Sequence, residues 1–300
     1  MIIGWCVLKR IKGIKPNSAN NCFNLNLIFN QILIIMDIIQ AMKERRSVRS
    51  FNGQALAPNI ISDLQKAIEE SYTLFGGKIT IRLKYFDLKG DFKPSTYGVI
   101  KGASDYFLMA IGEGEDSALT ARFQFEQIVL KAWEMGLGTC WIAGTYKGSQ
   151  FDQGEKWPEG ESLKIICPVG FPEKQRMFEK VMRFTVGSDK RKPFSELFFE
   201  NDFNKPLSPE SKFGEALEML RIAPSSTNSQ PWRVLVNGDK VLFYYKPKSP
   251  ASILDTGIGI CHFIETEKYN GFEGKFYKAT EFPTPPEDWR YLVSYIRDKK

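Results

Sequence analysis

The sequence contains little of the chemistry on which many enzyme mechanisms depend. Its 300 residues include a single histidine, His262. One histidine excludes a histidine-rich metal site, and a Ser-His-Asp or Cys-His mechanism would have to use His262 itself. That residue stands in the apolar helical run IGICHFIE, which favours a packed core histidine over a catalytic one. We therefore expect no metal site and no dedicated acid-base catalyst from the protein.

Paired cysteines, strong net charge and long apolar runs are also missing. The five cysteines are odd in number and never form a CxxC pair, which favours a reducing cytosol over a disulfide framework or a structural zinc site. The formal charge of +6 is mild, and basic residues alternate with acidic ones. The apolar run at 27–35 is far shorter than the roughly 20 residues that span a bilayer. These features predict a cytoplasmic protein that binds neither nucleic acid nor membrane.

The first 35 residues differ from the rest of the chain. They combine a basic start with an asparagine-rich patch and an apolar run, and no small-x-small cleavage site follows. A clean amphipathic helix, MDIIQAMKERR, then opens at Met36. We expect residues 1–35 to be a disordered or spurious extension, and a signal or anchor segment is the alternative.

Amphipathic helices and short strands fill the remainder, and 43% apolar residues suffice for one large core or two modest ones. The hydrophobic patterns predict helices and strands in alternation. The expected helices lie at about 37–45, 58–71, 116–134, 209–222 and 252–268. The expected strands lie at 78–86, 105–113 and 163–171, with a hairpin in VLVNGDKVLFYY. In that hairpin, Asn237-Gly238 predicts a type I′ turn with two positive-φ residues.

The predicted elements repeat along the chain. A Phe-Asn pair at 51–52 precedes Pro58 and a helix, and the Phe-Asn pair at 203–204 precedes Pro209 and a helix. Each series ends in a glycine-rich exit, GLGTCWIAGT or GFEGKFYKAT. Two fused α+β units, 36–200 and 201–300, would pack face to face like a C2 dimer. Chance similarity between two helical segments is the alternative.

Two motifs are rich in ligand-binding groups. In RRSVR the chain leaves a helix, and an extended segment turns alternate side chains to one face. Arg45, Ser47 and Arg49 would then converge, and forked guanidiniums suit a phosphate monoester. A solvated basic run is the alternative. The second motif, APSSTNSQPWRV, places far more hydrogen-bonding groups at a helix-to-strand junction than a turn requires.

Together with GLGTCWIAG, PVGFP and KRKPFSE, these motifs resemble the nitroreductase (flavin reductase) family over nearly all of 36–280. The resemblance implies an α+β, nitroreductase-like fold with a central, mainly antiparallel sheet and long core helices. It also implies FMN at an interface between two similar subunits. The implied cofactor-binding residues are Arg45, Arg46, Ser47, Arg49, Trp141, Ile142, Ala143, Gly144, Lys190, Arg191, Pro224, Ser225, Ser226 and Asn228. The arginine arm and 190–191 would hold the phosphate end, 141–144 would follow the ring, and 224–228 would line it from the other half.

The order of the motifs departs from the family. In ordinary members, as the resemblance implies, PSSxNxQPW follows RRSVR after the next helix, but here that slot holds ESYTLFGG at 70–77. The second-half slot for RRSVR contains Glu200 and Asp202, which would repel a phosphate. One copy of each arm on opposite halves predicts a monomer that mimics a homodimer and has one flavin site.

The function implied is an FMN-dependent NAD(P)H oxidoreductase. It would pass a hydride from NADH or NADPH through the flavin to an electron-poor acceptor such as a nitroaromatic, a quinone or a flavin. No GxGxxG follows a strand, which argues against a separate Rossmann nicotinamide domain. The alternatives are a flavin-binding or storage protein without turnover, and a member with other flavin chemistry such as dehalogenation. For the latter, 145–162 is the only candidate lid.

Overall fold

The computed structural model describes residues 37–74, 76–90, 92–173, 190–249 and 251–298. The chain divides into two units, 1–36 and 37–300, and only the second is described below. The prediction for residues 1–35 therefore lies outside the described residues. Among the helices that are described, none combines the length and the apolar character that a membrane crossing needs.

The five predicted helices are present, one of them with a different start, and a short helix at 148–151 was not predicted. They are α2 (Ile38–Glu44), α3 (Pro58–Glu70), α4 (Glu115–Glu134), α5 (Gly148–Phe151), α7 (Gly214–Ile222) and α8 (Ala251–Tyr269). Asp37 caps α2 by accepting the Gln40 N–H at 2.8 Å, and Pro58 occupies the first turn of α3. The start predicted for α7 at Pro209 is wrong. The segment 208–214 forms tight turns instead, since the Ser211 N–H bonds three residues back to Ser208.

The strands form two sheets and not the single central sheet that was predicted. The first has the order β1-β2-β4-β3 and is antiparallel throughout. Its strands are β1 (Ile79–Tyr85), β2 (Asp105–Gly112), β3 (Gly138–Thr139) and β4 (Glu161–Gly170). The second has the order β6-β5-β7-β8-β10-β9 and is antiparallel except for the pair β5–β7. Its strands are β5 (Phe198–Glu200), β6 (Asp202–Pro206), β7 (Trp232–Asn237), β8 (Lys240–Tyr245), β9 (Gly274–Tyr277) and β10 (Arg290–Arg297).

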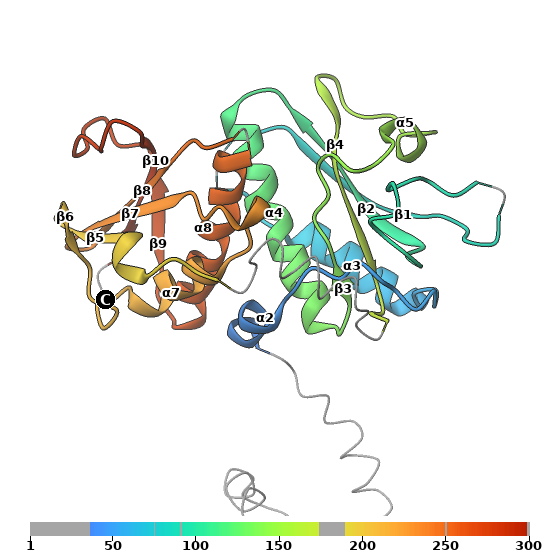
Figure 1. Cartoon of the computed structure of the whole chain (residues 1–300), viewed down its shortest axis with the longest axis horizontal. Coiled ribbons are helices and arrows are strands. Elements are labelled where there is room, and N and C mark those ends of the chain that lie inside the picture. Colours follow the sequence, from blue (N-terminus) through green and yellow to red (C-terminus); the bar gives the residue numbers. More distant parts are fainter. Residues whose placement is uncertain (1–36, 75, 91, 174–189, 250, 299–300) are drawn as a thin grey trace, which may run out of the picture. The chain divides into compact units, whose positions relative to one another are not determined.

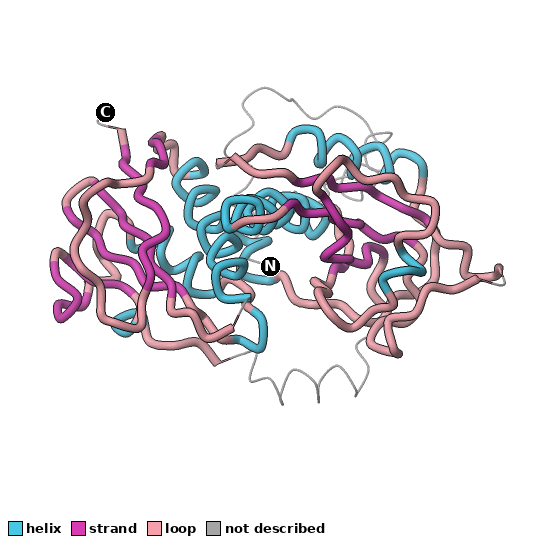
Figure 2. Tube along the Cα trace, turned by 90° about the horizontal axis from the view of Figure 1, so that it is seen from above, coloured by secondary structure: helices cyan, strands magenta, loops and turns pink. Residues whose placement is uncertain are grey.

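The reason for two sheets is that helices, not strands, meet in the middle of the unit 37–300. Figures 1 and 2 show α4 and α8 side by side with one sheet on either side of the pair. The helices come very close where Gly257 faces α4, because a Cβ there would lie 2.7 Å from the Leu119 carbonyl oxygen. The predicted α+β fold, antiparallel pairing and long core helices are confirmed.

The β7–β8 hairpin is confirmed, but its turn type differs. Asn237 pairs with Lys240, so the loop consists of Gly238 and Asp239. In this turn Gly238 has a positive φ of 56°, and neither Asn237 nor Asp239 does. A positive φ at the first central position alone is the pattern of a type II′ turn. The prediction of a type I′ turn at Asn237-Gly238 is therefore wrong, because the loop begins one residue later, at Gly238.

The contact between α4 and α8 contains buried charges as well as apolar side chains. Arg122 and Glu126 on α4 are at most 5% exposed, and Asp255 and His262 on α8 are fully buried. Charged groups without water need partners, because an unpaired buried charge is very costly. The groups that contact these four residues include Arg45, Trp141 and Ser226, which belong to the candidate site.

Candidate functional site

The RRSVR segment runs beside the glycine-rich exit of α4. The Val48 N–H donates to the Thr139 carbonyl at 2.8 Å, and Ser47 forms a parallel bridge with Thr139. Val48 and Ser50 are buried. The residues of intermediate exposure in this arm are Arg45, Ser47 and Arg49. Burial therefore alternates from Ser47 to Ser50. That Arg45, Ser47 and Arg49 converge on one ligand stays a prediction. Arg46 is exposed, and its guanidinium lies 5.8 Å from the Trp133 ring.

Arg45 is a buried cation with unused hydrogen-bonding capacity. Its side chain is 6% exposed, and its Nε lies 3.7 Å from Oε1 of Glu126. Its Nη1 is buried and has no hydrogen-bond partner among the described residues. A buried donor left without a partner costs about 1–3 kcal/mol. An anionic group bound beside Arg45 would remove that cost.

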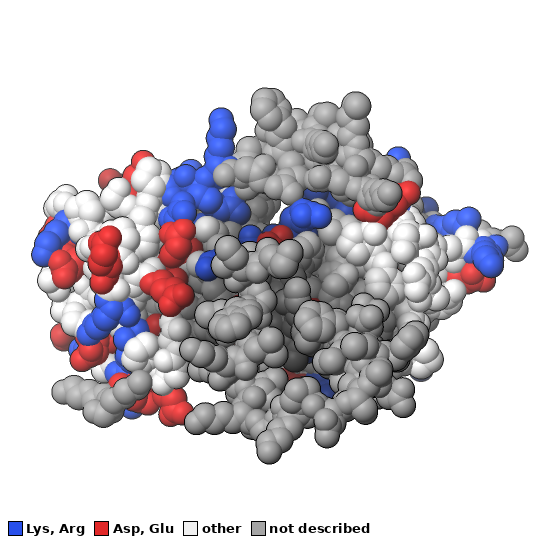
Figure 3. Space-filling view, turned by 90° about the horizontal axis from the view of Figure 1, so that it is seen from below, with Lys and Arg blue, Asp and Glu red and all other residues white. Residues whose placement is uncertain are grey.

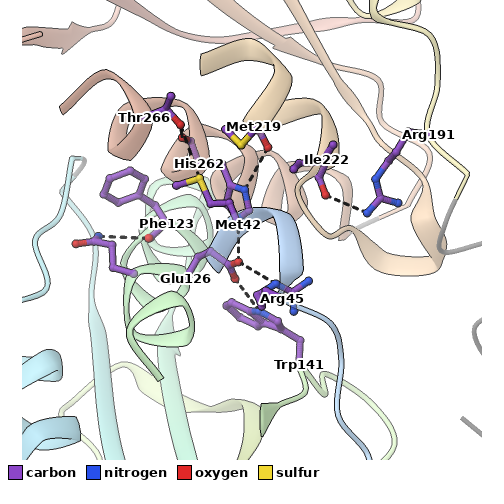
Figure 4. A network of polar contacts seen from close by, with 11 residues as sticks. Met42, Arg45, Phe123, Glu126, Trp141, Arg191, Met219, Ile222, His262 and Thr266 are labelled. Carbon is purple, nitrogen blue, oxygen red and sulfur yellow. Dashed lines mark hydrogen bonds and ion pairs between the residues drawn. The ribbon is translucent and has the colours of Figure 1, made fainter. Parts of the chain in front are cut away.

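Glu126 connects Arg45 to the segment WIAG. Its Oε2 accepts the Trp141 Nε1–H at 3.0 Å, and its Oε1 lies 3.0 Å from His262 Nε2 (Figure 4). Trp141 also packs edge-on against Phe125, with ring centroids 4.7 Å apart. The partly buried indole is therefore held against the core by these two contacts.

The rest of WIAG passes from the core to open space. Ile142 is buried and exchanges two 3.0 Å backbone hydrogen bonds with Ile166. Ala143 and Gly144 are exposed, and a Cβ added at Gly144 would meet no atom within 4 Å. A flat ligand could approach the backbone of these two residues without a clash.

The PSSTNSQ loop, 224–230, has an unusual backbone. Thr227, Asn228 and Gln230 have positive φ values of 50°, 55° and 47°. Such conformations cost of order 1–3 kcal/mol each outside glycine and persist only where the surroundings hold them. Clusters of them occur at binding and active sites, so the loop is a candidate for one.

The loop's own side chains supply much of that support. Ser225 Oγ accepts the Gln230 N–H at 3.0 Å, and Gln230 Oε1 accepts the Lys192 N–H at 2.8 Å. The Asn228 amide donates to the Lys190 carbonyl at 2.6 Å. The polar richness of this motif therefore serves first to build the loop and to join it to the KRK segment, 190–192.

Arg191 ties the same two segments to the end of α7. Its Nη1 donates to Asn228 Oδ1 at 2.5 Å. Its Nη2 donates to the Ile222 carbonyl at 3.0 Å (Figure 4). Two of the predicted cofactor-binding residues, Arg191 and Asn228, are thus brought together. Because one guanidinium nitrogen bonds the loop and the other bonds the end of α7, the arginine orients the loop relative to that helix.

Asp255 joins the second-half loop to the first-half segments. It accepts the Ser226 N–H at 2.8 Å and pairs with Arg122 Nη1 at 3.1 Å. The Arg122 guanidinium in turn lies 4.8 Å from the Trp141 ring centroid. Burial raises the pKa of Asp255 to about 6, although Arg122 and the Ser226 N–H act to lower it. The motifs RRSVR, WIAG and PSSTN therefore belong to one connected cluster.

The sequence patterns did not identify four members of this cluster as site residues. They are Arg122, Glu126, Asp255 and His262. His262 is buried as predicted, but both of its ring nitrogens have polar partners, so it is more than a packed core residue. The available signal was the presence of charged residues at helical spacing within apolar helix faces, Arg122 and Glu126 at i,i+4.

The grouping of possible metal ligands and the distribution of surface charge bear on two other kinds of site, for a metal ion and for nucleic acid. Among them, no group of three or more histidine, cysteine, aspartate or glutamate residues could hold a metal ion. On the face shown in Figure 3, basic and acidic side chains are interspersed over the described surface. The prediction that the chain does not bind nucleic acid stays a prediction.

Comparison with known proteins identifies the class. A family model described as "Putative TM nitroreductase" matches residues 37–266, and the chain belongs to this nitroreductase family. The crystal structure of a "putative nitroreductase" from Thermotoga maritima MSB8 is 23% identical, with a TM-score of 0.55 over 87% of this chain and 94% of that one. This likeness shows that the two chains share a fold.

Other solved structures match less of the chain. A "putative nitroreductase in complex with FMN" from Desulfovibrio desulfuricans is 17% identical, with a TM-score of 0.36 over 48% of this chain and 94% of that one. An "FMN-dependent Nitroreductase" from Clostridium difficile R20291 is also 17% identical, with a TM-score of 0.35 over 45% and 88% of the two chains. Among curated proteins, none matched the sequence.

Proposed function

We propose that the chain is an FMN-dependent NAD(P)H oxidoreductase that works in the cytoplasm. Its acceptor would be an electron-poor small molecule such as a nitroaromatic, a quinone or a flavin. Membership of a nitroreductase family supports an oxidoreductase. The observation that carries the proposal is the buried guanidinium of Arg45, whose Nη1 lacks a partner in the cluster that joins the three motifs.

The residues present fit this cofactor. Arg45 and Arg49 would hold the phosphate through charge-assisted hydrogen bonds. The backbone of Ala143 and Gly144, which borders open space, would face the ring. The exposed Ser226 would approach from the second half. When bound, FMN supplies the capacity to take a hydride from a reduced nicotinamide and to give it to a second substrate.

Anaerobic mixing tests the proposal. The purified protein is saturated with FMN and mixed without oxygen with NADH or, separately, with NADPH. We expect the long-wavelength flavin absorbance to bleach with one or both donors and to return when a nitroaromatic or quinone is added. A yellow colour that persists with both donors would instead indicate a binding or storage protein. Failure to bind FMN would refute the cofactor itself.

The candidate lid, 145–162, offers no support for a different flavin chemistry. Within it, Glu155 pairs with Arg82 at 2.7 Å and with Lys84 at 2.8 Å, both on β1. The Arg82 guanidinium also lies 4.6 Å from the Trp157 ring centroid. The segment is therefore fastened to the first sheet.

A further inference from the structure

The chain's single histidine lies between the two arms of the proposed site. His262 Nδ1 is 3.2 Å from the Met219 carbonyl oxygen on α7, and His262 Nε2 is 3.0 Å from Glu126 Oε1 on α4 (Figure 4). Helix α7 leads directly into the PSSTN loop. Glu126 contacts Arg45 and Trp141. His262 therefore links the second-half arm to the first-half arm.

The Met219 side of the ring requires a hydrogen on Nδ1. In a continuing helix the Met219 carbonyl would accept the Ala223 N–H, but Ala223 donates to the Leu220 carbonyl at 3.2 Å. A carbonyl oxygen can only accept, so the nitrogen that faces it must donate. His262 thus caps the end of α7 with its Nδ1–H.

The Glu126 side requires a second hydrogen. Glu126 Oε2 accepts the Trp141 Nε1–H at 3.0 Å, and the Arg45 guanidinium lies beside Oε1. Both neighbours present hydrogens to the carboxylate, whose oxygens therefore act as acceptors toward them. A carboxylate oxygen has no hydrogen to give, so the 3.0 Å contact with His262 needs a hydrogen on Nε2. A ring with hydrogens on both nitrogens is a cation.

We propose that Glu126 and His262 form a net-neutral ion pair that leaves the positive charge of Arg45 available to an anionic ligand. The two charges of the pair cancel, and that of Arg45 remains. If His262 were neutral, the negative charge of Glu126 would instead neutralise the positive charge of Arg45. Glu126 and His262 are thus positioning residues, which act through Arg45 and Trp141. Naming the anion as the FMN phosphate rests on the proposed function, whereas the charge state of the pair does not.

Nuclear magnetic resonance tests the charge state directly. Protein labelled with nitrogen-15 in histidine gives the signals of His262 alone, because the chain has one histidine. We expect a hydrogen on both ring nitrogens at neutral pH in the flavin-free protein. A ring nitrogen without hydrogen, at either position, would overturn the proposal. The measurement needs no cofactor, so its result stands even if the proposed function fails.

Binding by variants tests the consequence for Arg45. In His262→Gln the carboxylate of Glu126 loses its counter-charge and compensates Arg45. We expect about a tenfold or greater loss of FMN affinity in the flavin-free protein, and little change for riboflavin, which has no phosphate. The double variant Glu126→Gln/His262→Gln restores neutrality and should recover most of the FMN affinity. A merely structural role predicts that the double variant binds no better than His262→Gln, and that result would overturn the proposal.

Thr266→Val serves as the matched control. Thr266 is buried one turn further along α8, and its hydroxyl donates to the His262 backbone carbonyl at 2.8 Å and contacts the Met42 sulfur at 3.7 Å. The substitution changes a buried polar contact on the same helix without changing charge, so FMN affinity should remain at the wild-type value. A loss equal to that of His262→Gln would show that any disturbance of α8 weakens binding, and would contradict a charge effect.

Discussion

Asp255 is a buried carboxylate on which two opposing effects act. Burial raises its pKa to about 6, above the ordinary value of about 3.9, while Arg122 acts in the other direction. A carboxyl group whose pKa is higher in the folded state contributes stability that is present below the ordinary value and is lost as pH rises through about 6. The asparagine amide of Asp255→Asn resembles the protonated carboxyl and does not titrate.

This gives a prediction for pH dependence. As pH falls from 7 to 5, the free energy of unfolding of the wild type should rise relative to that of Asp255→Asn. Urea unfolding of both proteins at several pH values measures the difference. Asp63→Asn, which removes an exposed carboxylate from α3, is the control for a change in surface charge. The opposite slope would show that the ion pair with Arg122 outweighs burial.

Arg49 gives a prediction for binding. If Arg49 clamps the phosphate, Arg49→Ala should remove on the order of 2 kcal/mol of FMN affinity, about thirtyfold. Riboflavin affinity should barely change, because riboflavin lacks the phosphate. Titration of the flavin-free protein with each ligand measures both. Arg290→Ala, an exposed arginine on β10, should leave both affinities unchanged. Equal losses of FMN and riboflavin affinity in Arg49→Ala would exclude a phosphate clamp.

The individual residues of the cluster were predictable to different degrees. Arg45, Ser47 and Arg49 could be grouped because the period of an extended chain is local information. The partners of Glu126 could not, since they come from α8, α2 and the exit of α4. Which helix faces meet depends on close packing such as that at Gly257, and this is not encoded at any one position.

At the scale of elements, local patterns predicted the helices and strands well wherever one face is buried. The fully buried β2 and the amphipathic α3 were located within a residue or two. The start of α7 was missed because Pro209 is equally suited to a turn and to a first helical turn, and here the turn is formed. The β7–β8 turn was predicted one residue too early, because the pairing of Asn237 with Lys240 sets the register of the hairpin.

The PSSTNSQ loop gives a prediction at this scale. Gln230 is 3% exposed and connects the loop to Lys192 and Lys190. Gln230→Ala removes these bonds and should cost about 1 kcal/mol of stability, because partly buried backbone groups lose their partners. Limited digestion with trypsin should cut the KRK segment faster than in the wild type. Gln153→Ala, at an exposed position, is the control. Unchanged cleavage of Gln230→Ala would mean that Arg191 and Asn228 suffice to hold the loop.

At the scale of the whole molecule, residues 37–300 form one compact unit in which two sheets flank a pair of helices. The strand β5 lies before the predicted boundary at residue 200, yet it pairs with β7 of the second sheet. The boundary was placed where the pattern of Phe-Asn and proline repeats in the sequence. Strand β5 pairs with a strand more than 30 residues further along the chain, and no local pattern indicates that pairing. That the halves are fused copies of one subunit stays a prediction.

Flavin stoichiometry tests the fused-dimer interpretation. A homodimer with both arms on each subunit would have two equivalent sites. In the fused-dimer interpretation the counterpart of the arginine arm would be the edge hairpin β5–β6, where Glu200 pairs with Lys205 at 2.5 Å and Asp202 is exposed. The first-half segment 70–77 lacks the PSSxN residues. We therefore expect one FMN for each chain, because the second site lacks the groups that bind a phosphate.

The same reasoning predicts the oligomeric state. Helices α4 and α8 contact each other within one chain, with Arg122 paired to Asp255 and Glu126 to His262. In the fused-dimer interpretation this contact covers the surface that a dimer would bury, so the FMN-loaded protein should remain monomeric at micromolar concentration. Light scattering combined with flavin absorbance on one sample gives mass and stoichiometry together. Two FMN molecules per chain would show that the acidic hairpin does not prevent phosphate binding. A dimer that loses FMN when Ser225 and Asn228 are changed in only one of its subunits would place the arms of each site on different chains, and the similarity of the two halves would then be coincidence.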